Sequence, residues 1–195
     1  MSSAHAVEFY NEFGGGVSQI SGATPFFDSS TARAPAKLGR GLAATFTLAG
    51  DVSRSSNWVH FHLGLQHKYL TGTGSGTSHS LQATYPLLRV EVKRLYFGVG
   101  VTPFVWKDGL TRAAGSIAGL GEVGFLFPIT PEIAFGTHLA LQAVSTSGAQ
   151  SPKPAADVGF YFRLYLGSIR FGKADDSGGS SSDYKGWRYF KGLSR

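Results

Sequence analysis

The 195-residue sequence has no cysteine, few charged residues and no long apolar run. The absence of cysteine excludes disulfide frameworks, thiolate metal sites and cysteine nucleophiles. Charged residues make up 15% of the chain, against about 25% in typical soluble domains, so much of the surface is not built to face water. No apolar stretch reaches the roughly 18 to 20 residues of a membrane-spanning helix, which excludes helical spanning. The length is that of one domain.

Glycine is abundant, with 27 residues, and large apolar side chains alternate with small or polar ones along most of the chain. Period-two alternation is typical of β-strands with two different faces. It predicts eight strands, at residues 4–20, 38–49, 58–70, 77–93, 95–106, 113–127, 132–144 and 156–167. A bulge is expected at Pro86, because proline lacks the backbone donor that a strand needs.

The connections between these strands alternate in length. Short connections are expected after the second, fourth and sixth strands, at residues 50–57, 93–94 and 128–131. Longer loops rich in glycine, serine or proline are expected at residues 21–35, 71–76, 107–112 and 147–155. One end of the sheet therefore carries tight turns and the other end carries loops.

The two strand faces are partitioned as in a membrane barrel. In a soluble sheet the face opposite the apolar one is rich in charge, whereas here it is mostly small or polar. In a membrane barrel the large apolar side chains face lipid and the small and polar ones fill the lumen. The sequence therefore predicts an all-β fold, an eight-stranded antiparallel transmembrane up-and-down barrel. The polar side chains expected in its lumen are Glu8, His60, His62, Arg89, Glu91, Glu122, Glu132, His138 and Arg163.

Three segments carry a family resemblance: residues 85–93, 97–104 and the closing strand at 159–167. They resemble the eight-stranded outer-membrane barrels of the OmpA, OmpX and OmpW type. The resemblance implies a barrel over residues 1–171 in a Gram-negative outer membrane, in contact with outer-membrane lipid and lipopolysaccharide. Because no basic and apolar leader follows Met1, the sequence is expected to be a mature form without its signal peptide.

The end of the chain departs from the family pattern. Barrels of this type finish on an aromatic residue, which would be Phe171, and residues 172–195 follow it as a tail expected in the periplasm. A flexible Gly-Ser linker, residues 176–182, leads to an aromatic and basic element. Its candidate interaction residues are Tyr184, Trp187, Arg188, Tyr189 and Phe190. The barrel rim, the lipid surface and a periplasmic or outer-membrane protein partner all remain open as contacts of this tail.

The polar residues of the predicted lumen allow several interpretations. An interlocked network of salt bridges is expected, because each charge in a narrow dry interior needs a partner. A narrow pore lined by the same charges is the sharper alternative. A metal or proton-relay site formed by His60, His62 and His138 is weighed as well, but the sequence places no third ligand beside the His-x-His pair, so neither a metal nor a cofactor is predicted.

Ser78-His79-Ser80 places two hydroxyls beside an imidazole and is the candidate for nucleophilic catalysis. This segment does not match the His-x-Ser-Asn pattern of the lipid A deacylase barrels, and adjacent strand residues point to opposite faces. No enzyme activity and no nucleic-acid partner are therefore expected. Lys107, Arg112 and Lys153 in the loops are candidates for contact with lipopolysaccharide phosphates. The predicted role is structural or partner-binding, in an envelope complex or adhesion; a narrow channel and, after it, a lipid-modifying enzyme stay open as alternatives.

Overall fold

The computed structural model describes residues 5–21, 38–53, 58–74, 77–107, 111–112, 115–145 and 153–171. They form strands β1 (His5–Ser21), β2 (Leu38–Asp51), β3 (Val59–Gly74), β4 (Thr77–Val92), β5 (Leu95–Thr102), β6 (Val105–Lys107), β7 (Thr111–Arg112), β8 (Ile117–Pro128), β9 (Ile133–Ser145) and β10 (Lys153–Phe171). Among these residues there is no helix long and apolar enough to cross a membrane.

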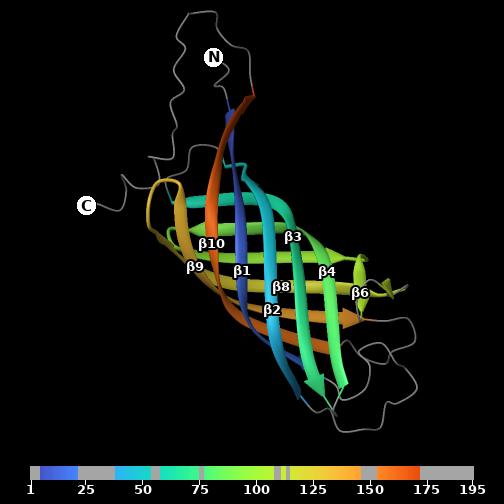
Figure 1. Cartoon of the computed structure of the whole chain (residues 1–195). Helices are drawn as coiled ribbons and strands as arrows, with labels where there is room; N and C mark the ends of the chain where they lie inside the picture. Colours follow the sequence, from blue (N-terminus) through green and yellow to red (C-terminus); the bar gives the residue numbers. More distant parts are fainter. Residues whose placement is uncertain are drawn as a thin grey trace, which may run out of the picture.

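The sheet closes into a barrel of eight antiparallel strands (Figure 1). Around the barrel the order is β1, β2, β3, β4, β5, β8, β9 and β10, and β10 pairs with β1 to close the ring. Strand β6 continues the fifth strand after a break and pairs with β4, and the short β7 pairs with β6. The predicted all-β, eight-stranded antiparallel barrel is therefore confirmed, with the additional β6–β7 hairpin.

Turns and loops lie at opposite ends of this barrel, as the sequence predicts. The β2–β3, β4–β5 and β8–β9 connections lie at the end where β1 begins and β10 ends. The β4–β5 turn consists of Lys93 and Arg94, and Lys93 adopts a positive φ of 59°. The predicted loop at residues 71–76 is wrong, because pairing continues from Thr71 with Ser80 to Gly74 with Thr77.

The predicted bulge at Pro86 is also wrong. Pro86 pairs with Leu65 in a register that runs without a shift along all of β3 and β4. Inward and outward positions on β4 alternate through the proline without a change of phase. The irregularity lies in the neighbouring strand instead, where Pro103 and Phe104 separate β5 from β6. The proline is tolerated because the strand beside it, rather than its own strand, changes course.

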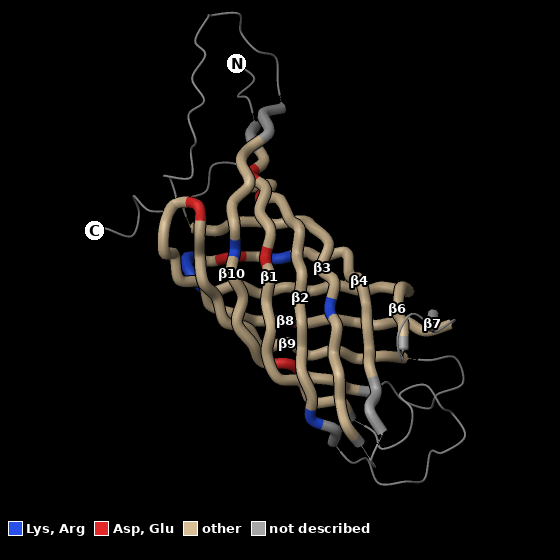
Figure 2. The backbone as a smooth tube through the Cα atoms, viewed as in Figure 1, with Lys and Arg blue, Asp and Glu red and all other residues tan. Residues whose placement is uncertain are grey.

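Burial alternates along the strands. On β5 each outward residue, such as Phe97 or Val99, is exposed, and each inward residue, such as Tyr96, is buried. Charged residues are few, and several line up across the barrel in the half nearer the termini (Figure 2). The outer surface is thus apolar, and the polar side chains concentrate inside.

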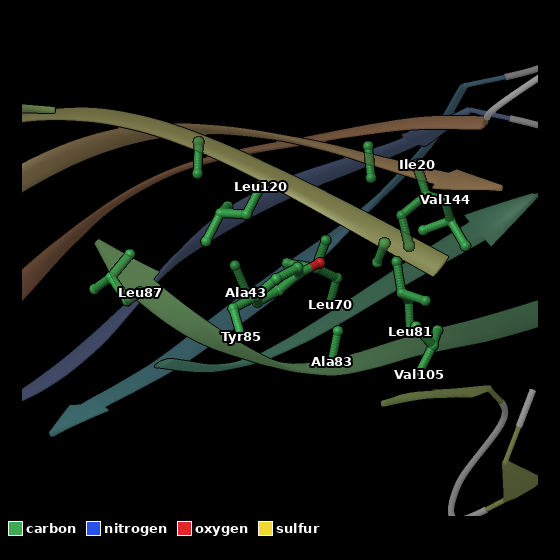
Figure 3. Packing of buried hydrophobic residues seen from close by; sticks show 13 residues of the cluster. Ile20, Ala43, Leu70, Leu81, Ala83, Tyr85, Leu87, Val105, Leu120 and Val144 are labelled. Carbon is green, nitrogen blue, oxygen red and sulfur yellow. The ribbon is translucent and has the colours of Figure 1, made fainter. Parts of the chain in front are cut away.

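The lumen nearer the loops holds a hydrophobic cluster beside the buried pair of Lys68 and Asp157, whereas the sequence indicated a small and polar interior throughout. Thirteen buried hydrophobic residues form one cluster there (Figure 3). Its larger members include Ile20, Leu70, Leu81, Leu120 and Val144. Alanines on the surrounding wall leave room for these branched side chains, so the barrel is packed as a core on this side.

Three consecutive glycines on β1 let this strand approach its neighbours closely. A Cβ atom on Gly16 would collide with the carbonyl oxygen of Val158 on β10. A Cβ atom on Gly15 would instead meet its nearest neighbour, the carbonyl oxygen of Ala43, at 3.5 Å, which is ordinary contact. The close approach therefore requires glycine at position 16, whereas position 15 accepts a side chain.

We expect Gly16→Ala to lower the free energy of unfolding by about 1–3 kcal/mol, the usual cost of overpacking. Gly15→Ala, its matched control, should change the same quantity by less than about 0.5 kcal/mol. Urea titration of the refolded barrel in micelles measures both. Equal stabilities of the two variants would contradict the close approach at Gly16.

Candidate functional site

Glu12 on β1 joins two arginines from different strands inside the barrel. Its Oε1 accepts a hydrogen bond from Nη1 of Arg89 on β4 at 2.6 Å. The same oxygen accepts one from Nε of Arg163 on β10 at 2.9 Å. All three side chains are at most 3% exposed. One carboxylate therefore ties β4 to the β1–β10 seam across the lumen.

Each arginine also holds a carboxylate of its own. Arg89 donates to Oε1 of Glu122 on β8 from Nη2 at 2.7 Å and from Nε at 3.2 Å. Arg163 donates from Nη1 to Oε2 of Glu91 on β4 at 2.8 Å. These shared contacts join the five residues into one network. Charge-assisted bonds of this kind are the stronger class of hydrogen bond. We call Glu12, Arg89, Glu91, Glu122 and Arg163 the cross-lumen network.

Aromatic rings cover the charged groups of this network. The guanidinium carbon of Arg89 lies 4.2 Å from the ring centre of Tyr96, and that of Arg163 lies 4.2 Å from the ring centre of Tyr10. The ring of His62 packs edge-on against Tyr10, with centres 5.4 Å apart. Cation–π contacts are strongest where water is excluded, so the tyrosines both fill space and stabilise the arginines.

A second polar cluster centres on Asp157 of β10. Nζ of Lys68 donates to both carboxylate oxygens of Asp157, at 2.7 and 2.9 Å. Nε2 of His138 lies 2.7 Å from Asp157 Oδ1, and Gln142 Nε2 donates to Oδ2 at 3.4 Å. Tyr85 donates to Gln142 at 2.7 Å. Lys68 and Asp157 have no exposed side-chain surface, so this pair is fully desolvated.

A third polar contact lies at the turn end of the barrel. Nδ1 of His60 lies 2.7 Å from Oδ2 of Asp51, and both side chains are partly buried. The other carboxylate oxygen, Oδ1, accepts hydrogen bonds from the backbone and the hydroxyl of Ser53. This arrangement fixes the first residues after β2 against the start of β3.

The structure brings most of the predicted lumen residues together. His62, Arg89, Glu91, Glu122 and Arg163 lie in or beside the cross-lumen network, with His62 Nε2 3.5 Å from Glu91. His138 belongs to the Asp157 cluster, and His60 belongs to the contact at the turn end. Glu8 is half-buried near the same end, opposite Asp51 in the β1–β2 register.

The prediction that Glu132 lies in the lumen is wrong. Glu132 is exposed in the β8–β9 turn, one residue before β9 begins. Its carboxylate accepts a hydrogen bond from the Thr130 hydroxyl at 3.0 Å. Alternation places a residue on a face only while the strand lasts, and here the chain is still turning.

Several functional residues were not singled out from the sequence. The main ones are Glu12, Lys68 and Asp157, of which the first lies at the centre of the cross-lumen network. Each shares its strand phase with a predicted lumen residue: Lys68 with His62, and Asp157 with Arg163. The alternation that identified those residues therefore carried the signal for these three as well.

His60, His62 and His138 do not form one cluster. His60 and His62 lie with ring centres 6.3 Å apart, while His138 packs beside Tyr161 and Asp157 in the other cluster. Across the described ranges, no three His, Asp or Glu side chains are grouped so as to hold a metal ion. The tail residues Tyr184, Trp187, Arg188, Tyr189 and Phe190 lie outside the described residues, and so the division at residues 171 and 172 stays a prediction.

No protein-family model matches the sequence, and no curated protein matches it. The solved structure of Neisserial surface protein A, NspA, is similar with a TM-score of 0.56 at 10% identity, over 81% of this chain and 97% of that chain. The fold is that of a small outer-membrane barrel. The outer membrane protease OmpT from Escherichia coli matches with a TM-score of 0.37 at 9% identity, over 84% of this chain and 97% of its own. The outer membrane protein AlkL matches with 0.36 at 13% identity, over 89% and 94%.

We expect Arg163→Met to lower the free energy of unfolding by about 3–5 kcal/mol, because it leaves the buried carboxylate of Glu91 without its arginine partner and Glu12 with Arg89 alone. Glu132→Gln, which changes an exposed turn residue, should cost less than about 0.5 kcal/mol. Guanidinium unfolding in lipid vesicles measures both variants. A cost for Arg163→Met as small as that of the control would show that the network contributes little to stability.

Proposed function

We propose that the protein is an integral bacterial outer-membrane barrel with a closed lumen, and that it performs a structural or partner-binding role through its loops and C-terminal tail. The single observation that carries this proposal is the bridge from Arg89 through Glu12 to Arg163 across the barrel interior. Because of this bridge, the charged side chains inside the barrel bind one another, and they are not available to bind a passing solute.

Membrane insertion is supported by the outer surface. Large apolar side chains point outward from every one of the eight barrel strands, and examples are Leu42, Val101, Leu141 and Phe160 at 69%, 66%, 60% and 59% exposure. An apolar surface of this extent is far larger than the few hundred Å² that soluble monomers expose. In lipid the same surface is favourable, while the closed sheet leaves no backbone edge unpaired in the bilayer.

The orientation follows from the even number of strands. In barrels of this class the short turns face the periplasm and the longer loops face outward. Strand β1 begins and β10 ends at the turn end, so we place the tail that follows Phe171 in the periplasm. We assign partner binding to the loops and to this tail, because the charged side chains described in the lumen bind one another.

We propose no catalytic role for Ser78-His79-Ser80. Ser80 lies at an outward position of β4 beside the inward Leu81. Neighbouring strand residues point to opposite faces, so a hydroxyl and an imidazole adjacent in sequence do not converge on one substrate. The charged groups described in the lumen likewise bind one another, in the cross-lumen network and in the Asp157 cluster.

The membrane assignment predicts heat-modifiable migration. An unboiled sample folded in detergent should migrate differently in a dodecyl sulfate gel from a boiled one, because the closed sheet resists unfolding until it is heated. Detergent should also be required to keep the folded chain monomeric. A chain that stays folded and monomeric in plain buffer would overturn the membrane assignment.

A closed lumen predicts that the barrel conducts no ions. In planar bilayers the wild-type barrel should give no steady single-channel steps, since an eight-stranded interior is just wide enough to be filled by side chains. Lys93→Ala, at the exposed turn, serves as the control and should be equally silent. Discrete steps in the wild type whose size changes with Arg89→Ala or Glu122→Ala would establish a narrow channel instead.

A further inference from the structure

The outer surface of β3 and β4 carries polar side chains toward the loop end. His67 and Thr84 face each other in the register of these strands, as do Tyr69 and Gln82, and Trp106 on β6 is paired with Gln82. These positions alternate with buried inward residues, and so they point away from the lumen. We call His67, Tyr69, Gln82, Thr84 and Trp106 the outer polar patch.

The patch interrupts the lipid-facing belt. On β3 the outward apolar positions run over residues 59–65 and on β4 over residues 86–92, each shorter than the roughly 9–11 residues with which a strand crosses a bilayer. On the far side of the barrel, the outward positions of β10 are apolar over residues 158–166, which meets that length. The outer polar patch therefore lies at the edge of the hydrocarbon layer on the loop side.

Polar atoms at this depth need polar partners. Nδ1 of His67 lies 2.9 Å from Oγ1 of Thr84, and within the described part of the chain Thr84 is the hydrogen-bond partner of this ring. An imidazole has two nitrogens that form hydrogen bonds, and leaving either without a partner in an apolar medium is costly. Tyr69 is 37% exposed on the same surface. The patch thus presents hydrogen-bonding groups to whatever covers it.

The chemistry of the patch favours a sugar over a phosphate. Its members are an imidazole, an amide, hydroxyls and two aromatic rings, with no lysine or arginine among them. Phosphate recognition relies on arginine and lysine, and Lys68 beside the patch points inward to Asp157. A saccharide offers hydroxyls to the polar groups and apolar C–H faces to the rings of Tyr69 and Trp106.

We propose that the outer polar patch binds the saccharide headgroup of a glycolipid in the outer leaflet. This inference rests on the proposed outer-membrane location, which places the loop end of the barrel in that leaflet. The glycolipid chains lie along the apolar positions below the patch, and its headgroup forms hydrogen bonds with side chains of the outer polar patch.

The test is lipid binding by the full chain in a zwitterionic detergent that carries no sugar. Lipid A, a disaccharide glycolipid, and phosphatidylglycerol, an anionic lipid without a sugar, are titrated separately. Native mass spectrometry counts bound lipid, and Trp106 fluorescence in a Trp58→Phe, Trp187→Phe background follows occupancy. The test variant combines His67→Leu, Gln82→Leu and Thr84→Val. The control is Thr137→Val, which removes an outward hydroxyl from β9.

The triple variant should bind lipid A at least about tenfold more weakly than the wild type, as expected from losing several hydrogen bonds. Thr137→Val should bind as the wild type does, and phosphatidylglycerol should bind weakly to all three. Equal lipid A affinity of wild type and triple variant would overturn the inference. Equal wild-type affinity for the two lipids would do so as well, because the sugar would then not be recognised.

Three further outcomes separate the alternatives. A wild-type dimer that the triple variant abolishes, with lipid A binding unchanged, would assign the patch to a second copy and overturn the inference. A chain that needs no detergent would instead overturn the proposed function itself. If the chain is heat-modifiable and inserts into vesicles, but the triple variant binds lipid A as tightly as the wild type, the inference fails and the proposed function stands.

Discussion

The position of Glu12 between Arg89 and Arg163 is the contact on which the interior of this barrel depends. A charge moved from water into a narrow dry lumen is tolerated only when it is paired and hydrogen-bonded. Each arginine satisfies this condition by holding Glu12 together with a second carboxylate, Glu122 or Glu91. Removing either arginine leaves a buried carboxylate without its arginine partner, since Glu122 then loses Arg89 or Glu91 loses Arg163. The network consequently fixes the distance between the β1–β10 seam and the opposite wall.

Several glycines of the barrel wall lie opposite large inward-facing side chains. A Cβ atom on Gly136 would collide with the ring of Tyr161, and one on Gly124 would collide with the ring of Tyr96. Tyr96 and Tyr161 pack edge to face, with centres 5.9 Å apart. In a barrel of fixed circumference each large inward ring needs a place on the wall without a side chain. Part of the glycine excess of the sequence therefore provides space for inward-facing tyrosine rings.

Strand number, strand faces and most of the lumen residues were predictable, because alternation reports directly on which side of a strand a residue lies. The partner of each charge was not predictable, since pairing depends on strand tilt and on side-chain reach across the lumen; Lys68 reaches Asp157 over a sequence separation of 89. Glu132 was misplaced because alternation does not mark the residue at which a strand starts. Pro86 was misjudged because the neighbouring strand, not its own, carries the irregularity. The hydrophobic cluster inside the lumen was missed because small and branched side chains suit either face.

A filled lumen moves the question of function to the outside of the barrel, and that outside is not uniform. One side carries a strip of phenylalanines: Phe135 lies 5.6 Å from Phe160 and 5.5 Å from Phe162 between ring centres, and Phe127 lies 6.4 Å from Phe135. These rings give β8, β9 and β10 a continuous surface that only acyl chains or another apolar surface can cover. On β3 and β4 the apolar surface stops earlier and the outer polar patch begins. Lipid contact alone would be served equally well by an apolar surface on every strand, so the two sides of the barrel present different chemistry to whatever surrounds them.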